Sequence, residues 1–330
     1  MNEPIKSVSE FMQLLPKEEN GFEFFYRGEP MDYGKTKNTP SIFRKKSWIE
    51  NEHNIFRDFI LRNPDDFKDE KTTFEKLVKM QHYGLPTRLL DVTSNALIAL
   101  YFAVEHSQCE KFTEVSAFNI YQKTYEANGF VYIFKLPKDE IKFYDSDAVS
   151  VLANLSRVNN NQLNNIQIFI PFYKNIFLDN LKKLEQKTLN LSNKSVLLEQ
   201  DFNSFSELSK IIKDNREILE KSAQDFMSFI LEDGRSMDPM NIYEYIEHSI
   251  LVKPLLSNRR IVMQSGAFLL FGMDKTKIEP SENKFNTISI QIDADSKDKI
   301  LKELKQLGIS KDRIYPEMEK VAEHLKDHYS

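Results

Sequence analysis

Arg27 is the first side chain whose setting could support chemistry. It follows a run of aromatic residues and precedes Gly28. A guanidinium at the end of a buried strand can bind a phosphate or a carboxylate through two parallel hydrogen bonds. It can equally well pair with an acid of the same chain, and Asp91 and Glu29 are the candidates. Both interpretations fit the sequence.

The second candidate segment runs from Gln81 to Ser94, where polar residues are interleaved with strongly apolar ones. His82, Arg88 and Asp91 are its ionisable members. Such interleaving is typical of a cleft lined by a few convergent polar groups. The alternative is a buried network without ligand, in which Arg88 pairs with Asp91 and His82 lies at the C-terminal end of a helix. Spacing alone does not separate the two.

Several familiar chemistries have no counterpart in the chain. It contains no glycine-rich phosphate loop, no serine-hydrolase elbow and no zinc-protease helix. The five histidines other than His82 stand outside any metal-binding or nucleophile pattern, so no metal site is expected. The sequence therefore does not favour a kinase, a Rossmann dehydrogenase or a zinc hydrolase.

Composition sets the class of protein. The 330 residues are 41% hydrophobic and 29% charged, the balance of a soluble globular protein, and the formal net charge is -5. That charge gives no indication of nucleic acid as a partner. Cys109 is alone, and neither a signal-peptide pattern near the N-terminus nor a membrane-length apolar run occurs. We expect a cytoplasmic protein that does not engage a membrane.

The local pattern predicts the elements that position the candidate residues. A buried strand over 22–26 ends at Arg27, and a helix over 74–82 ends before Gly84 and Pro86. A short strand over 88–92, a turn and helix cap over 93–95 and an apolar helix over 96–105 follow. The strand, cap and helix form the best-defined local unit of the sequence.

The rest of the chain predicts mixed helices and strands. Helices are expected from Ser7, over 48–61, 148–155, 298–307 and 318–329, and strands over 129–134, 261–271 and 285–292. An Asn-, Lys- and Glu-rich stretch over 162–250 is expected to be a helical insertion that packs on one side. No repeat and no glycine- or serine-rich linker occurs, so residues 1–330 are expected to form a single domain.

The two candidate segments also carry a resemblance. The runs Phe25-Tyr26-Arg27-Gly28 and Gln81-His82-Tyr83-Gly84-Leu85-Pro86-Thr87-Arg88-Leu89-Leu90-Asp91 resemble the FRG-domain family, with Tyr26 in place of the phenylalanine. The resemblance continues over 147–155, 258–268 and 299–316. It is weakest between residues 162 and 250.

FRG domains are remotely similar to the ADP-ribosyltransferase fold, so the resemblance implies an α+β architecture of split antiparallel sheets that grip NAD between them. It implies that Arg27 and Gly28 hold NAD as substrate and that Thr93 and Ser94 support the site. Arg88 is a further candidate nucleotide contact.

That fold also carries a catalytic glutamate on a later strand, and the corresponding strand here, 260–271, offers Gln264. An amide cannot ionise, so Gln264 could orient a ribose hydroxyl or the acceptor but could not stabilise positive charge. Either Asp91 or Glu29 supplies the charge, or the protein binds a nucleotide without transferring ADP-ribose.

The resemblance therefore implies an ADP-ribosyltransferase or NAD glycohydrolase-like effector of a bacterial defence or toxin system. In this reading His82 and Gln264 contact the ribose or a nucleotide or protein acceptor, and Asp91 stabilises charge. The alternative is a non-catalytic nucleotide-binding sensor or interaction module. A third reading makes Arg27, Arg88 and Asp91 a folding network only.

Overall fold

The computed structural model describes residues 3–116, 119–166, 221–235, 245–273, 280 and 285–317, with the backbone alone described at 109–116, 119–124 and 286. These residues form an α+β protein built on one seven-stranded sheet and a two-stranded hairpin. In this part of the chain, no helix is long and apolar enough to cross a membrane.

The large sheet has the strand order β6-β7-β8-β2-β1-β5-β9. Its strands are β1 (Phe22–Glu29), β2 (Leu89–Thr93), β5 (Gly129–Pro137), β6 (Lys142–Phe143), β7 (Ser249–Lys253), β8 (Gly266–Phe271) and β9 (Asn286–Ile292). Strands β6 and β7 are parallel, and every other neighbouring pair is antiparallel. Aromatic and β-branched residues such as those of β5 favour these strands.

The sheet is split in the middle. Strands β1 and β2 pair only at Tyr26 and Thr93, whereas β1 pairs with β5 from Phe22 to Glu29 and β2 pairs with β8 from Leu89 to Thr93. Two parts of the sheet, the mixed β6-β7-β8-β2 and the antiparallel β1-β5-β9, are therefore joined through one residue pair between β1 and β2. Polar side chains near that contact can reach solvent.

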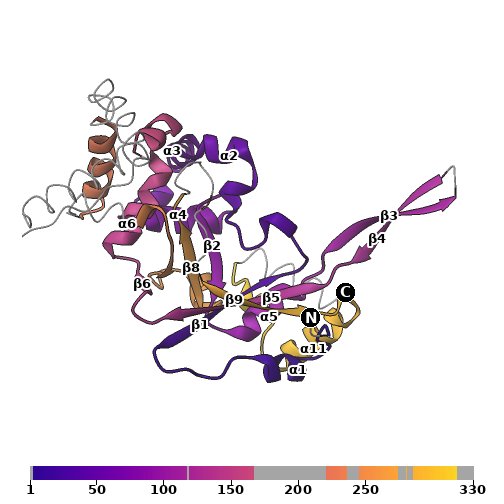
Figure 1. Cartoon of the computed structure of the whole chain (residues 1–330). Helices are drawn as coiled ribbons and strands as arrows, with labels where there is room; N and C mark the ends of the chain where they lie inside the picture. Colours follow the sequence, from indigo (N-terminus) through magenta and orange to yellow (C-terminus); the bar gives the residue numbers. More distant parts are fainter. Residues whose placement is uncertain are drawn as a thin grey trace, which may run out of the picture.

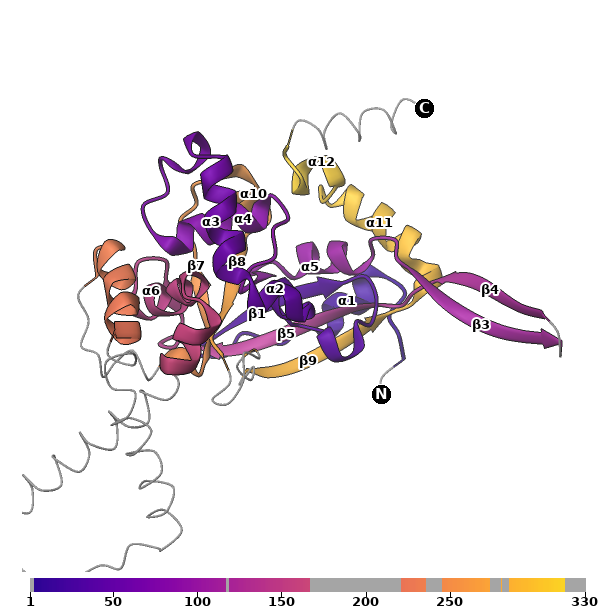
Figure 2. The same cartoon turned by 90° about the horizontal axis from the view of Figure 1, so that it is seen from above.

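The helices form two groups (Figures 1 and 2). They are α1 (Val8–Leu14), α2 (Lys46–Glu50), α3 (Glu52–Arg62), α4 (Thr73–His82), α5 (Ala96–Ala103), α6 (Asp147–Asn154), α10 (Arg259–Met263), α11 (Lys297–Gln306) and α12 (Lys311–Ile314). Helices α1, α5 and α11 share a core with β1, β5 and β9. Helices α3, α4 and α6 share a second core with β7 and β8. A third core lies on the other face of the sheet, around Phe25, Leu90 and Leu269.

Asp91 lies between the two helical groups. Because successive side chains of a strand point to opposite faces, Leu89, Asp91 and Thr93 share one face of β2. Leu89 belongs to the core beneath α4, and Thr93 is paired with Tyr26, which belongs to the core beneath α5. Asp91 is the one exposed residue of β2. The Asp91 carboxylate therefore lies at the bottom of the gap between the two helical groups.

Two glycines let α5 lie directly on the sheet. A Cβ atom at Gly28 would come within 1.9 Å of the Ala99 carbonyl oxygen, and one at Gly129 within 2.0 Å of the Ala103 carbonyl oxygen. Neither position could accept a side chain without moving the helix. Gly28 of the Arg27-Gly28 motif is thus required by packing.

Most of the predicted elements are confirmed. The matches are α1, α4, α5, α6, α11, β1, β2, β5 and β9, with ends shifted by a few residues. The single helix expected over 48–61 is divided at Asn51 into α2 and α3. The strand expected over 261–271 is wrong in its first half, because Arg259–Met263 forms α10 and β8 begins only at Gly266.

One hairpin was not predicted, and two predicted segments lie largely outside the described residues. The hairpin of β3 (Gln108–Ser116) and β4 (Asn119–Glu126), which projects from the body in Figures 1 and 2, was not predicted from the sequence. Most of the insertion expected over 162–250 and the helix expected over 318–329 lie outside the described residues. Within the former, 221–232 is helical, and β7 begins at Ser249.

Candidate functional site

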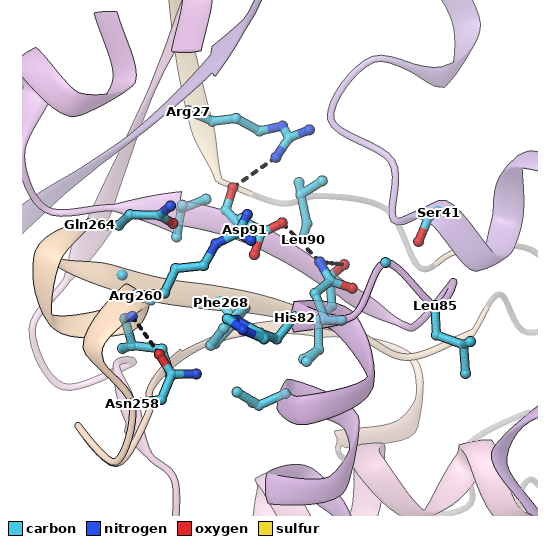
Figure 3. A pocket seen from close by; sticks show the side chains of 18 of the residues that line it. Arg27, Ser41, His82, Leu85, Leu90, Asp91, Asn258, Arg260, Gln264 and Phe268 are labelled. Carbon is cyan, nitrogen blue, oxygen red and sulfur yellow. Dashed lines mark hydrogen bonds between the residues drawn. The ribbon is translucent and has the colours of Figure 1, made fainter. Parts of the chain in front are cut away.

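A cleft of about 290 Å³ opens at the split of the sheet (Figure 3). We call it the main cleft. Its walls are the end of β1, the loop before α2, the C-terminal turn of α4, β2, α10 and the start of β8. The polar side chains that line it are Arg27, Ser41, Arg44, Gln81, His82, Asp91, Asn258, Arg260 and Gln264. The structure thus brings together four predicted site residues, Arg27, His82, Asp91 and Gln264.

Arg27 is fixed from both sides. Its Nε donates to Glu29 Oε1 at 2.9 Å, and its Nη1 donates to the backbone carbonyl of Asp91 at 2.9 Å. The Glu29 side chain is only 1% exposed and also accepts a hydrogen bond from the Asn38 amide. Glu29 is therefore committed to orienting Arg27, and it lines none of the cavities described here.

Gln81 orients the Asp91 carboxylate. Its Nε2 donates to Asp91 Oδ2 at 2.9 Å and to the Leu89 carbonyl at 3.2 Å. Its Oε1 accepts from the hydroxyl of Thr87, which fixes the direction of the amide. Both sequence motifs therefore meet at Asp91, where Arg27 binds the backbone and Gln81 the side chain.

Local chain geometry puts Gln81 and His82 at the rim of the cleft. Helix α4 ends in a Schellman turn, in which the Gly84 amide donates to Gln81 and the Leu85 amide to Met80. Gly84 has φ +79°, a conformation that glycine adopts without strain. The glycine of the second motif thus ends α4 one turn after its last buried residue.

Two further arginines line the main cleft. Arg44 donates from Nε and Nη2 to the Thr39 carbonyl, and burial together with the nearby charge of Arg27 lowers the pKa of Arg44. Arg260 lies over the ring of Tyr315, 5.2 Å from its centroid. Both residues were missed as site residues in the sequence, although Arg260 falls within a run that carries the family resemblance.

His82 faces the cations of the cleft. Its Nε2 lies 3.5 Å from Glu317 Oε1, and Arg260 Nη1 lies 3.6 Å from the same oxygen. Burial, followed by the charge of Arg260, lowers the pKa of His82, while Glu317 opposes that shift. His82 therefore takes up a proton less readily than an ordinary histidine, which suits it to accept or donate a hydrogen bond rather than to bind an anion by charge.

Gln264 lines the cleft from a turn and not from a strand. The residue ends α10, its backbone amide donates to Arg260, and the following Ser265 has φ +46°. The Gln264 side chain donates from Nε2 to the Ile314 carbonyl at 3.1 Å. Its backbone carbonyl accepts from the Thr93 hydroxyl at 2.7 Å.

Thr93 and Ser94 join two turns. The Thr93 hydroxyl also accepts from the Asn95 amide, and both the amide and the hydroxyl of Ser94 donate to the Ser265 carbonyl. These bonds hold the turn between β2 and α5 against the turn before β8. In this structure Thr93 and Ser94 therefore stabilise the wall of the cleft.

Arg88 lies elsewhere. Its side chain is 0% exposed and pairs with Glu52, with Nη2 and Nε at 2.6 and 2.9 Å from Oε2. Nη1 donates to the Gly272 carbonyl, and the guanidinium lies over the Phe43 ring. Burial raises the pKa of Glu52, opposed by Arg88. The pairing of Arg88 with Asp91, one of the two readings of the sequence, is wrong, and Arg88, also expected as a nucleotide contact, lines none of the three cavities.

Two more cavities adjoin the main cleft. The β1–α5 compartment, of about 220 Å³, shares Arg27, Asp91, Val92, Arg260 and Gln264 with it. The outer groove, of about 600 Å³, shares Val78, His82, Asn258 and Arg260 with it. Arg260 lines all three, so one side chain stands where they meet.

The described residues thus form an α+β protein whose split sheet opens onto a cleft lined by arginines and one exposed carboxylate. Residues 22–111 match the model of the FRG domain family. The matched segment contains both motifs that meet at Asp91. Comparisons with the curated proteins and with the solved structures found no match.

Proposed function

We propose that this protein binds NAD in the main cleft and breaks the bond between nicotinamide and ribose, as an ADP-ribosyltransferase or NAD glycohydrolase. The observation that carries the proposal is the combination of three arginines with the exposed Asp91 carboxylate on one cleft. The diphosphate of NAD is anionic and its ribose becomes positively charged as the bond breaks, so a site for this reaction needs charges of both signs.

The arginines suit the diphosphate. Arg27, Arg44 and Arg260 come from three different elements and line the same cavity. Planar guanidinium groups bind phosphate oxygens through paired hydrogen bonds. Burial beside Arg27 lowers the pKa of Arg44, and a bound anion would relieve this repulsion between like charges.

Asp91 suits the reacting ribose. When the bond from ribose C1′ to the nicotinamide nitrogen breaks, its electron pair leaves with nicotinamide and positive charge develops on the ribose. A carboxylate oriented beforehand by Gln81 stabilises that charge without reorganising. The incoming water or acceptor hydroxyl then forms the new bond to C1′ and loses its proton. His82 and the Gln264 amide are candidates to hydrogen bond the ribose or acceptor.

A binding-only role is the second candidate. It is favoured by Gln264, because an amide stands where the ADP-ribosyltransferase resemblance would lead one to expect a glutamate. In that case the same cleft recognises a nucleotide as a sensor, and nothing is transferred. Either role is compatible with the bacterial defence or toxin setting that the family resemblance suggests.

The test combines calorimetry with NAD and release of nicotinamide from labelled NAD. We expect the wild-type protein to bind and cleave NAD, and Asp91→Asn to bind with similar affinity but react about 10²–10³-fold more slowly. Asp139→Asn, an exposed aspartate outside the three cavities, is the matched control. Binding without cleavage would favour the sensor, and no binding of NAD would refute both the cleavage of NAD and a sensor of NAD.

A further inference from the structure

The β1–α5 compartment lies beside the main cleft and has a different character. Besides the residues that it shares with the main cleft, it is lined by Tyr26, Phe102, Glu105 and Tyr315. Three of these are aromatic and the fourth is a carboxylic acid. Asp91 belongs to both cavities, so a group bound in the compartment would meet a ligand in the main cleft at Asp91.

Glu105 follows the C-terminal end of α5 and is only partly exposed. Its Oε1 accepts a hydrogen bond from the Tyr315 hydroxyl at 3.0 Å. Its backbone carbonyl accepts from Lys297 Nζ at 3.1 Å, which anchors this turn to α11. The carboxyl group is thus held in a defined place on the compartment wall.

Burial raises the pKa of Glu105, opposed by the Tyr315 hydrogen bond and by the charges of Lys311 and Arg260. Tyr101 is a further ionisable neighbour, because the negative charge of Glu105, with that of Asp312, adds to the burial that raises the pKa of Tyr101. Glu105 therefore exchanges its proton closer to neutral pH than an ordinary glutamate does, as a general base must.

Asp91 and Glu105 are two carboxyl groups on one cavity in unlike surroundings. Asp91 is exposed and hydrogen bonded to an amide, whereas Glu105 is half-buried against tyrosines. Where two carboxyl groups share a site, such a difference in surroundings can give them different roles in one reaction.

We infer that the β1–α5 compartment holds the nucleophile, water or an acceptor hydroxyl, and that Glu105 is its general base. The inference rests on the proposed cleavage of NAD. The nucleophile oxygen forms its bond to ribose C1′, the bond from C1′ to nicotinamide breaks with its electron pair on nicotinamide, and the nucleophile's proton passes to the Glu105 carboxylate.

The other buried acids near the cleft do not fit this role. Glu29 forms an ion pair with Arg27 and lines none of the three cavities. Glu317 lines the outer groove and lies beside His82 and Arg260. It does not line the compartment, so it is not placed to accept a proton from a nucleophile bound there. Among the described residues, Glu105 is the carboxyl group that lines the compartment together with Asp91.

The experiment measures nicotinamide release against pH for four proteins: wild type, Glu105→Gln, Tyr315→Phe and Asp298→Asn. Glu105→Gln keeps the shape of the side chain, and we expect NAD affinity within about twofold of wild type and turnover lowered about 10²-fold or more. The acidic limb of the pH profile, where Glu105 takes up its proton, should vanish in this variant.

Tyr315→Phe tests Glu105 through the pH of the acidic limb, which would not shift if Glu105 had only a structural role. Removing the hydroxyl removes a hydrogen bond that favours ionised Glu105, so its pKa rises further and the acidic limb moves to higher pH. Asp298 is an exposed acid of α11 that lines none of the three cavities, and Asp298→Asn should keep the wild-type profile. Unfolding curves confirm that all four proteins are folded.

The outcomes separate the two proposals. If wild type releases nicotinamide and Glu105→Gln releases it equally fast with an unchanged acidic limb, Glu105 is not the base and the proposed function stands. An unmoved limb in Tyr315→Phe also counts against Glu105. If wild type binds NAD but releases no nicotinamide, the proposed cleavage is refuted, and the role of Glu105 is refuted with it.

Discussion

Arg27 and Arg88 make an instructive pair, because both belong to the motifs of the FRG segment and both are bound to a glutamate. The Arg88 side chain is 0% exposed, and its partner Glu52 is 6% exposed. The Arg27 side chain is 15% exposed and lines the main cleft. One pair is buried within the fold, and the other presents a guanidinium to the main cleft.

The difference follows from where each partner comes from. Glu29 is two residues from Arg27 on the same strand, so it orients the guanidinium toward the open split between β1 and β2. Glu52 begins α3, and it draws Arg88 into the space between that helix and the end of β8, under the Phe43 ring. The same residue type therefore faces a cleft in one motif and is packed in the interior in the other.

The largest effect is expected at Arg88. Arg88→Ala leaves Glu52 buried without its partner, and loss of one member of a buried ion pair costs about 3–5 kcal/mol. We expect that much loss in the free energy of unfolding, measured by urea denaturation, with little soluble protein at elevated temperature.

A double variant separates charge from packing. Arg88→Met with Glu52→Leu removes both charges and fills the space with apolar groups, a replacement that is often neutral. We expect it to regain most of the stability lost in Arg88→Ala. A double variant as unstable as the single one would mean that the charges themselves are needed.

The sequence predicted the parts of the site that depend on local pattern. The helix before Gly84, the strand that ends at Thr93 and the strand that carries Arg27 are confirmed, because periodicity and turn residues determine them. The partner of Arg88 could not be predicted in this way, since Glu52 lies 36 residues away and pairs through tertiary packing alone.

Long-range packing also explains the residues that were missed. Arg260 reaches the cleft because Arg259–Met263 is a short helix, capped by the Asn258 side chain, where β-branched residues suggested a strand. Glu105 becomes a cavity residue only when Tyr315, 210 positions away, folds against it. Asn258 before Arg259 was the available signal for the helix, as an N-cap residue.

The next largest effect is expected at Arg27, on ligand binding. Arg27→Lys keeps a positive charge near Glu29 but loses the planar guanidinium that can bind two oxygens. We expect NAD affinity, measured by calorimetry, to fall by about tenfold or more, or ~1.5–2 kcal/mol. The free energy of unfolding should change by less than in Arg88→Ala. A larger loss of unfolding free energy in Arg27→Lys than in Arg88→Ala would mean that Arg27 mainly stabilises the fold, as Arg88 does.

A smaller effect is expected from Gln81, which touches Asp91 but is not itself charged. Gln81→Met removes the hydrogen bond to Asp91 Oδ2 while keeping side-chain length. We expect kcat for nicotinamide release to fall about tenfold with KM unchanged, because a hydrogen bond to a charged group contributes about 1.5–3 kcal/mol at most. Gln306→Met, at an exposed position of α11, is the control. A change in KM alone would show that Gln81 binds ligand instead.

The smallest effect is expected at Glu317, and it should be a gain. The Glu317 carboxylate lies within 3.6 Å of both His82 and Arg260, yet neither of its oxygens makes a hydrogen bond in the described residues. An anionic ligand therefore competes with a poorly bonded carboxylate. Glu317→Gln should tighten binding of inorganic pyrophosphate by about two- to fivefold, the range for partly exposed ion pairs.

The affinity for pyrophosphate should also depend on pH, through the charge of His82. His82 has a lowered pKa, so the protein takes up charge at this residue at lower pH than at an ordinary histidine, and pyrophosphate affinity should rise as the pH falls through that pKa. Glu317 raises the pKa of His82, so in Glu317→Gln the rise should begin at lower pH. Glu232→Gln removes an exposed carboxylate that pairs with Arg157 outside the three cavities, and it should leave affinity and its pH dependence unchanged. Weaker pyrophosphate binding by Glu317→Gln would mean that this carboxylate positions Arg260 for the ligand rather than competing with it.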